Sequence, residues 1–395
     1  MSSYTLNTPL DTYAKRASTR AIFFVAGFAM GLWASLVPYA QNRLHFDAGS
    51  LGLLLLCLGT GSLLAMLFSG KLIGRLGCRK IMLLGIALTC IFLPTLAIID
   101  QFPFMALCLF FFGAGIGLAD VAVNVQGSLV EQSSDKPLMS GFHCLFSIGS
   151  IAGAGGGAIL FTLGLMPLTV TFIAIGVIAI ITATVFSELI PFGDHKEPNA
   201  VGMTKPRPNF RLVLMALMCM ICFMAEGAIL DWGGVFLTND RGLDITHAGW
   251  GFAIFGVTMS IMRFTGDKVV SLLGRKRVLV LSSIIAMSGY AVAVIIPDWK
   301  FTLLGFALVG IGAANIVPVL ITLAGQEKVM PVNMSVAMVA TLGYFGVLGG
   351  PALIGFIAHL TDLYTAFSIV ALTFLVIAVG AFKLKYVNEL PSLQE

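Results

Sequence analysis

The sequence predicts an all-α membrane protein of about twelve transmembrane helices in two six-helix, pseudo-symmetric halves. Its composition, its series of long apolar runs and a repetition between its two parts support this fold class. The 395 residues are 58% hydrophobic and 11% charged, with a mean hydropathy of +0.98, whereas soluble domains carry roughly 25% charged residues. Lipid rather than water therefore surrounds most of the protein.

The apolar runs have the length that a membrane requires. A helix crosses the hydrocarbon layer, ~30 Å thick, with ~20 apolar residues. Such runs lie at about 20–41, 49–70, 81–99, 103–130, 138–163, 168–189, 210–236, 246–266, 278–297, 300–324, 332–358 and 361–384. The first run follows a polar start and has no clear small-residue cleavage site, so we interpret it as a membrane helix and not as a signal peptide.

A polar, proline-bearing stretch between the sixth and seventh runs divides the chain near its middle. We expect an N-terminal bundle at 1–190, a linker at 191–209 and a C-terminal bundle at 210–395. With a cytoplasmic N-terminus, only Arg43, Arg241 and Lys300 of the 23 lysines and arginines fall on the outer side. Because basic residues concentrate in cytoplasmic loops, both termini and the linker are predicted to be cytoplasmic.

The second half repeats short patterns of the first in the same order. GIGLAD (115–120) matches GIGAAN (310–315), GSIAGAGG (149–156) resembles GVLGGPAL (346–353), and LIGRLGCRK (72–80) resembles VVSLLGRKR (269–277). Two six-helix repeats with a solute site near the midplane between them are typical of secondary transporters.

The loop after the second run carries a recognisable motif. Residues 70–80 read GKLIGRLGCRK, which resembles the signature G-x-L-x-D-R-x-G-x-[RK]-[RK] of the major facilitator superfamily. The resemblance implies a role in the conformational cycle for the matching residues, Gly70, Arg75, Gly77, Arg79 and Lys80. The acidic residue of the motif is replaced by Gly74, so the charged latch of the family is expected to be missing or built differently.

Three further segments resemble a narrower group within that superfamily. GLADVAVNVQGSLVE, GFHCLFSIGSIAGAG and FMAEGAILDW are similar to the YbjJ-like branch, which is distantly similar to the fucose-permease group of sugar:proton symporters. The resemblance implies a multi-pass protein of a bacterial inner membrane that works as a monomer and transports a small molecule by alternating access.

The fourth run contains one polar stripe. Gly113, Gly117, Asp120, Asn124, Gly127 and Glu131 are spaced by three or four residues and share one helical face. An ionisable residue near a helix centre costs roughly 2.5–3.5 kcal/mol on insertion scales, so the stripe must face protein or a water-filled cavity.

Asp120 is the first candidate for proton coupling. Burial favours the neutral form of a carboxyl group, and a proton-coupled carrier needs a group that changes its protonation. The matching residue of the second half is the uncharged Asn315, a candidate for solute binding together with Asn124. Alternatively, Asp120 only holds helices together through hydrogen bonds.

The seventh run carries Glu226 and Asp231. Five residues turn a helix by ~140° and advance it by ~7.5 Å, so the two carboxylates do not form one site. We expect Glu226 to bind the solute or a proton. Asp231, near the outer end, is expected either to contact the solute or to form a gate ion pair with Arg43 or Arg241.

Several other polar or aromatic residues are candidates for the solute site, each with a structural alternative. His143 can relay protons but also simply hydrogen-bond, and Tyr344 can offer a hydroxyl group. Trp33 and Trp232 can stack on a sugar ring or a cation or only fill space. Arg263 is expected to extend its side chain to the cytoplasmic surface.

Small residues predict close helix packing. Gly149, Gly153 and Gly157 recur every four residues in the fifth run, and Gly346 and Gly350 recur in the eleventh. In membranes this spacing allows helices to approach closely. The cysteines suggest neither a disulfide framework nor a zinc site, and all but Cys78 fall within apolar runs.

The patterns favour a secondary transporter that is not an enzyme. No nucleotide loop, metal motif, catalytic motif or nucleic-acid surface is present, so neither a cofactor nor a nucleic-acid partner is expected. The first hypothesis is proton-coupled symport of a small polar, sugar-like solute. Proton-antiport efflux of organic or cationic compounds, a transporter-derived sensor and an intramembrane enzyme remain as alternatives.

Overall fold

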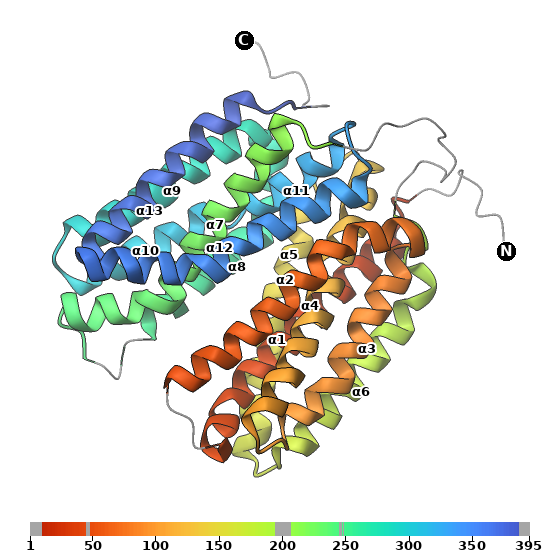
Figure 1. The fold of residues 1–395 in the computed structure, drawn as a ribbon. Coiled ribbons are helices and arrows are strands. Elements are labelled where there is room, and N and C mark those ends of the chain that lie inside the picture. Colours follow the sequence, from red (N-terminus) through yellow and green to blue (C-terminus); the bar gives the residue numbers. More distant parts are fainter. Residues whose placement is uncertain (1–9, 45–47, 194–206, 245–246, 248, 387–395) are drawn as a thin grey trace. The chain divides into compact units, whose positions relative to one another are not determined.

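The computed structural model describes residues 10–44, 48–193, 207–244, 247 and 249–386, and most of them are helical (Figure 1). The helices are α1 (Tyr13–Leu44), α2 (Ala48–Leu76), α3 (Cys78–Leu96), α4 (Phe102–Gln132), α5 (Met139–Thr162), α6 (Pro167–Val185), α7 (Phe210–Val235), α8 (Trp250–Leu273), α9 (Arg275–Ile295), α10 (Trp299–Ala313), α11 (Ile316–Gln326), α12 (Val332–Leu360) and α13 (Leu363–Gly380). Single tighter or wider turns follow three of them, η1 (Phe186–Glu188), η2 (Phe236–Asp240) and η4 (Ala381–Lys383).

These helices confirm the prediction of an all-α protein with about twelve spans. Within the described residues, eleven stretches are long and apolar enough to cross a membrane, and one of them, Trp299–Gln326, contains both α10 and α11. The twelfth is α8, which has 24 residues but is less apolar because it includes Arg263 and Asp267. Large apolar side chains such as Phe264, 75% exposed, cover the outside of the helices, as lipid contact requires.

Several helices differ in length from the apolar runs that predicted them, and the first and tenth spans differ in ways that matter for the site. The first helix begins at Tyr13 and not near residue 20. Polar turns precede the apolar run and belong to the same helix. Its Ser18 and Thr19 hydroxyl groups donate to the Lys15 carbonyl at 2.9 and 2.8 Å. The tenth span is interrupted at Ala314 and Asn315, between α10 and α11.

The chain divides into two compact units. Unit 1 comprises residues 1–135, 142–206 and 330–338, and unit 2 comprises 136–141, 207–329 and 339–395. Most of the linker expected at 191–209 lies outside the described residues.

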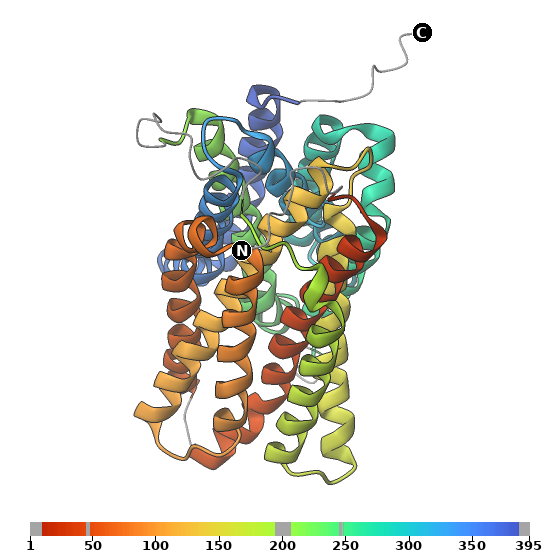
Figure 2. The ribbon, with the colours of Figure 1, turned by 90° about the vertical axis from the view of Figure 1, so that its right-hand side faces the viewer.

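In unit 1, α4 is the central helix. It packs along α2 and α3, which run beside it in Figures 1 and 2. Glycines bring these backbones together, because a Cβ atom on Gly113 would lie 2.0 Å from the Leu58 carbonyl oxygen and one on Gly61 would lie 1.9 Å from that of Phe110. The predicted contact of the fifth span is also present, since a Cβ atom on Gly153 would lie 2.1 Å from the Phe28 carbonyl oxygen of α1.

In unit 2, α9 and α10 form the corresponding close pair. Cβ atoms on Gly289 and Gly305 would each lie 2.5 Å from the carbonyl oxygen of the other residue. Tyr290 is fully buried, and its hydroxyl group donates to the Ala225 carbonyl of α7 at 2.7 Å. Gly346 of α12 approaches α7, because its Cβ atom would lie 2.1 Å from the Met220 carbonyl oxygen.

The turns after α2 and α8 show that the repeat extends to details of structure. Gly77 and Gly274 both have positive φ, 83° and 77°, a conformation that glycine adopts without strain. Two residues later, the Arg79 guanidinium lies over the Phe186 ring of η1 at 5.2 Å. In unit 2, Lys276 lies over the Phe382 ring of η4 at 4.3 Å.

Cys78 does not lie in a loop as the apolar runs suggested. It is the first residue of α3 and is fully buried, because the turn at Gly77 takes a single residue. All seven cysteines are free thiols.

Candidate functional site

In unit 1, hydrogen bonds connect Asp120, Asn124 and His143. The Asn124 amide nitrogen donates to Asp120 Oδ1 at 3.3 Å and to the Asp120 carbonyl oxygen at 2.9 Å. Asn124 Oδ1 lies 3.1 Å from His143 Nε2 of α5, so this ring nitrogen is the donor. Phe23 of α1 packs beside the imidazole, with ring centres 5.0 Å apart.

The rest of the α4 stripe faces protein, as its spacing predicts. Gly113 and Gly117 pack against Leu58 and Ser62 of α2, and Glu131 is buried. Helix α4 thus places Asn124 against His143 of α5 and packs its glycines on α2. Among the described residues, no cation lies within ion-pair distance of Asp120.

Trp33 of α1 lies deep in unit 1 and is 3% exposed. Its ring packs against Phe112 of α4, with centres 6.5 Å apart. The indole Nε1 has no hydrogen-bond acceptor among the described residues, although buried indole N–H groups usually find one.

In unit 2, the polar centre is an ion pair between adjacent spans. Arg263 Nη2 of α8 lies 3.5 Å from Glu226 Oε1 of α7. Both side chains are mostly buried, with 10% and 20% of their surfaces exposed. Cys222 Sγ lies 3.9 Å from the same carboxylate oxygen, one helical turn away.

The expectation that Arg263 reaches the cytoplasmic surface is therefore wrong. Ten residues separate it from the end of α8 at Leu273, or about 15 Å along the axis, more than an arginine side chain spans. A signal in the sequence could have shown the pair. Glu226 lies 14 residues before Asp240, where its span ends, and Arg263 lies 13 residues after Trp250, where the next begins, so both charges have similar depth.

The interruption of the tenth span lies beside this ion pair. Arg263 Nε donates to the Ala314 carbonyl oxygen at 3.3 Å, and Asn315 Nδ2 donates to the Met262 carbonyl oxygen at 3.4 Å. Asn315 is 1% exposed, and its Oδ1 accepts no hydrogen bond from the described residues. The structure thus pairs Arg263 with Glu226 and with the backbone of the interruption at Ala314, next to Asn315.

Unit 2 contains three other candidates, Asp231, Trp232 and Tyr344. Asp231 is exposed, as its position in the helix predicts. Trp232 Nε1 donates to the Pro351 carbonyl oxygen of α12 at 3.0 Å. Tyr344 of α12 is partly buried.

Arg43 and Arg241, the partners expected for a gate ion pair with Asp231, each cap a helix of their own unit. Arg43 donates to the carbonyl oxygens of Leu96, Ala97 and Ile99 at 2.6–2.9 Å. These carbonyls, at the end of α3, lack partners within the helix.

Arg241 caps the end of α9 in the same way. It donates to the carbonyl oxygens of Ala293 and Val294, both at 2.7 Å. The Tyr364 hydroxyl group accepts from Arg241 Nη1 at 2.8 Å. A cation at a helix C-terminus is favourable, and each half uses one here.

The loop motif is held by the segment that follows α6. Arg79 donates to the carbonyl oxygens of Ser187 and Leu189. A Cβ atom on Gly77 would lie 1.7 Å from the Pro191 carbonyl oxygen, so glycine is required there on steric as well as conformational grounds. Arg75 and Lys80 are exposed.

The position of Asn333 explains why the loop motif has Gly74 in place of its usual acidic residue. Residues 330–338 belong to unit 1, and the Asn333 amide donates to the Gly70 carbonyl oxygen. A Cβ atom on Gly74 would lie 2.8 Å from Asn333 Nδ2. A larger residue at 74 would therefore displace the amide.

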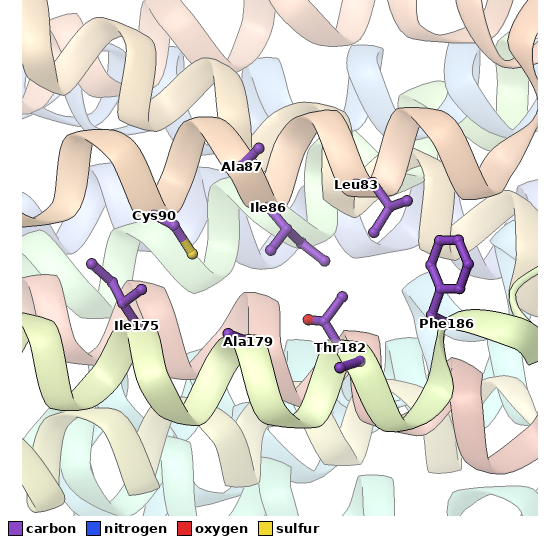
Figure 3. Close-up of a pocket in the computed structure, with 9 residues that line it drawn as sticks. Leu83, Ile86, Ala87, Cys90, Ile175, Ala179, Thr182 and Phe186 are labelled. Atoms are coloured by element: carbon purple, nitrogen blue, oxygen red, sulfur yellow. The ribbon is translucent and has the colours of Figure 1, made fainter.

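A groove in unit 1 lies between α3 and α6 (Figure 3). Its volume is about 540 Å³, and Leu83, Ile86, Cys90, Ile175 and Phe186 help to line it. Its lining is almost wholly apolar and includes none of the candidate site residues. The groove therefore gives no support for solute binding.

Comparison with known proteins identifies the family. The model of the Major Facilitator Superfamily matches residues 21–244 and again 212–394. The chain belongs to this superfamily. An uncharacterised MFS-type transporter of Yersinia pestis is 43% identical over 368 residues, which are 93% of this chain and 95% of the relative. The membrane protein MosC of Rhizobium meliloti is 28% identical over 86% of this chain and 83% of its own length.

Solved structures of the superfamily share the fold. FucP, crystallised in its outward conformation, matches with a TM-score of 0.83 and 18% identity over 94% of this chain and 99% of FucP. The human organic anion transporter MFSD10 matches with a TM-score of 0.74 and 16% identity over 94% of this chain and 100% of its own. The protein is thus a multi-pass membrane protein of a transporter superfamily.

Proposed function

We propose that this protein is a proton-coupled symporter that carries a small polar, sugar-like organic solute by alternating access. Residues 1–190 and 210–395 are the two moving halves in this proposal. The membrane is the bacterial inner membrane, with both termini cytoplasmic, and the monomer is the working unit among its lipids.

The connection of Asp120, Asn124 and His143 carries the proposal. A charge within a bilayer is costly unless it is compensated, and the described residues provide Asp120 with no cation. A proton can supply that compensation. Because Asn124 donates to Asp120 and accepts from His143, the charge of Asp120 orients the amide and, through it, the imidazole.

The remaining candidates have complementary roles. Glu226 is the second proton-coupling residue. Asn124, His143, Asn315 and Glu226 offer hydrogen bonds to a polar solute, together with Asp231 and Tyr344, while Trp33 and Trp232 offer flat apolar surfaces. Among the fold relatives, the fucose:proton symporter carries a solute of this class together with a proton.

The energy of one proton is sufficient for accumulation. Moving one charge through 100 mV releases about 2.3 kcal/mol, and about 1.4 kcal/mol corresponds to a tenfold ratio. One proton per solute therefore supports a gradient of roughly fifty-fold.

Purified protein in liposomes with a trapped pH dye tests the proposal. We expect at least one member of a panel of sugars, organic acids and cations to drive protons into the vesicles. We expect Asp120→Asn to abolish this signal while binding persists. Asp135→Asn, which removes an exposed carboxylate after α4, is the matched control and is expected to behave as the wild type.

The same assay separates symport from antiport. Efflux in exchange for protons would move protons and solute in opposite directions in oriented vesicles. If a solute that binds moves with intact proton coupling in Asp120→Asn, the role assigned to Asp120 is wrong.

A further inference from the structure

The ion pair in unit 2 is unlike a tight structural salt bridge. The 3.5 Å between Arg263 Nη2 and Glu226 Oε1 exceeds the roughly 2.7–2.9 Å of strong charge-assisted hydrogen bonds. A buried pair stabilises a protein only when its geometry is excellent. An arginine is also the preferred residue for recognising a carboxylate, since its planar fork can bind both oxygens. Arg263 therefore has the properties of a binding site for a carboxylate, and Glu226 is a carboxylate that it holds loosely.

The interrupted tenth span supports the same interpretation. Arg263 binds the Ala314 carbonyl group, which ends α10, and α11 begins two residues later at Ile316. Its N-cap residue, Asn315, forms no side-chain capping bond to the first turn, and the buried Asn315 Oδ1 has no donor among the described residues. The N-terminus of a half-helix carries positive partial charge, and interrupted membrane helices use this charge to bind anionic groups.

We propose that Arg263 is the binding site for an anionic group of the solute, in the first instance a carboxylate, and that Glu226 occupies this site when the solute is absent. The inference rests on the proton-coupled transport proposed above and narrows its substrate class to organic acids such as sugar acids. Glu226 acts as an internal substitute for the solute.

The groups that face Glu226 permit this exchange. Cys222 lies on its own helix at 3.9 Å, with Cys219 one turn before it, Arg263 approaches from α8, and the buried Tyr290 of α9 lies nearby. The Tyr290 hydroxyl group is already used, since it donates to the Ala225 carbonyl. Arg263 is the only cation among these groups, so an acid that binds it must displace Glu226.

The exchange balances charge. The solute carboxylate takes the place of Glu226 on Arg263, and the displaced Glu226 carboxylate takes up one proton from the side on which the solute enters. One anion and one proton bind together at this site, so its loaded and empty forms carry the same net charge, and the membrane potential acts on the separate proton that Asp120 carries. When the solute leaves, Glu226 releases the proton and pairs with Arg263 again.

The first test measures binding with matched probes. Purified full-length protein is melted in detergent between pH 5.5 and 8 with gluconate, lactate or benzoate, and separately with glucose, glycerol or benzyl alcohol. We expect at least one acid to raise the melting temperature while its neutral counterpart does not, with tighter binding at lower pH. If no acid has an effect, or if only neutral compounds bind, the proposal is overturned.

Variants then locate the binding. Glu226→Gln is expected to bind the effective acid at least as tightly as the wild type, and without dependence on pH. Arg263→Gln alone leaves a buried carboxylate and risks misfolding, so the deciding variant combines Arg263→Gln with Glu226→Gln. It is expected to fold and to bind at least tenfold more weakly. Lys328→Gln, which removes one exposed positive charge, is the control. Unchanged affinity in the double variant would overturn the assignment.

Proton flux distinguishes this inference from the proposed function. If acids bind through Arg263 but move no protons in liposomes, the symport proposal fails and the anion site stands. If neutral sugars drive proton entry and acids do not, symport stands and the anion site is wrong.

Discussion

The polar centres of the two units differ although their helices repeat. In α4, Asp120 is accompanied by an amide and an imidazole, and no cation among the described residues pairs with it. In α7, Glu226 is accompanied by Arg263. At the position that repeats Asp120, Asn315 binds the backbone of α8.

The scaffold around these centres is preserved. Arg43 and Arg241 cap α3 and α9, and Arg79 and Lys276 lie over phenylalanine rings after the sixth and twelfth spans. The difference is thus confined to the side chains that carry charge in the membrane. Unit 1 has a carboxylate that a proton can neutralise, and unit 2 has one that a cation neutralises.

The largest expected effect comes from breaking the ion pair. Arg263→Gln leaves the Glu226 carboxylate buried without its cation, which typically costs about 3–5 kcal/mol. Glu226→Gln together with Arg263→Gln removes both charges and is expected to recover most of the loss. Asp120→Asn is expected to cost less than about 1 kcal/mol, because an amide still accepts a neutral hydrogen bond. Thermal unfolding in detergent measures all three.

An equal loss of stability in Asp120→Asn and Arg263→Gln would contradict the difference between the two polar centres. Asp120 would then be a structural residue like the members of the ion pair.

The two arginine caps are expected to differ in strength. Arg241 is 8% exposed, binds two carbonyl groups and a hydroxyl group, and lies over the rings of Phe236 and Tyr364 at 4.6 and 4.7 Å. Arg43 binds carbonyl groups and is less buried. Hydrogen bonds to charged groups contribute about 1.5–3 kcal/mol, and cation–π contacts about 0.5–2 kcal/mol. We expect Arg241→Gln to cost about 3 kcal/mol and Arg43→Gln about 2 kcal/mol.

Melting temperatures of the two variants check this order. A larger loss for Arg43→Gln would show that the burial and the ring contacts of Arg241 do not strengthen its cap.

The glycine contacts are expected to be equal in the two units. Alanine at Gly153 or Gly346 places a Cβ atom 2.1 Å from a backbone carbonyl oxygen, and such overpacking costs about 1–3 kcal/mol. Gly156→Ala and Gly349→Ala are matched controls, because nothing lies within 4 Å of their Cβ positions. We expect the controls to be neutral or slightly stabilising, since alanine favours helices by ~1 kcal/mol.

Equal melting temperatures for the glycine variants and their controls would show that the helices yield at these contacts. Close packing at glycine would then not fix the positions of α1 and α5, or of α7 and α12.

The sequence predicts those features that depend on local pattern. Apolar length predicts the spans, and the spacing of Gly153 and Asp120 predicts which face of a helix meets protein. It does not predict contacts that join distant segments through single atoms. Arg43 and Arg241 look like outer-loop charges, yet each is held by carbonyl groups more than 50 residues away. Arg263 looks like a surface residue until its depth is compared with that of Glu226 on the preceding span.

The smallest expected effect concerns the ends of the first helices of the two units. Hydrogen bonds from Arg16 hold the pKa of Asp11 below its ordinary value. In unit 2, the related pair of Arg211 and Glu327 is wider, 3.7 Å, and its arginine is 42% exposed. We expect Asp11→Asn to lower stability at pH 7 by about 0.5 kcal/mol, since surface pairs contribute little.

The effect of Asp11→Asn has a definite pH window. Because the pKa of Asp11 is lowered in the folded protein, its stabilisation is fully present above the unfolded-state value of about 3.9 and is lost as the pH falls through the folded-state value. The melting temperatures of wild type and variant are therefore expected to stay apart down to about pH 3.9 and to converge only as the pH falls through the lower folded-state value. A difference that persists below the folded-state pKa of Asp11 would show that Asp11 acts through neutral hydrogen bonds, for example with Ser134, and not through its charge.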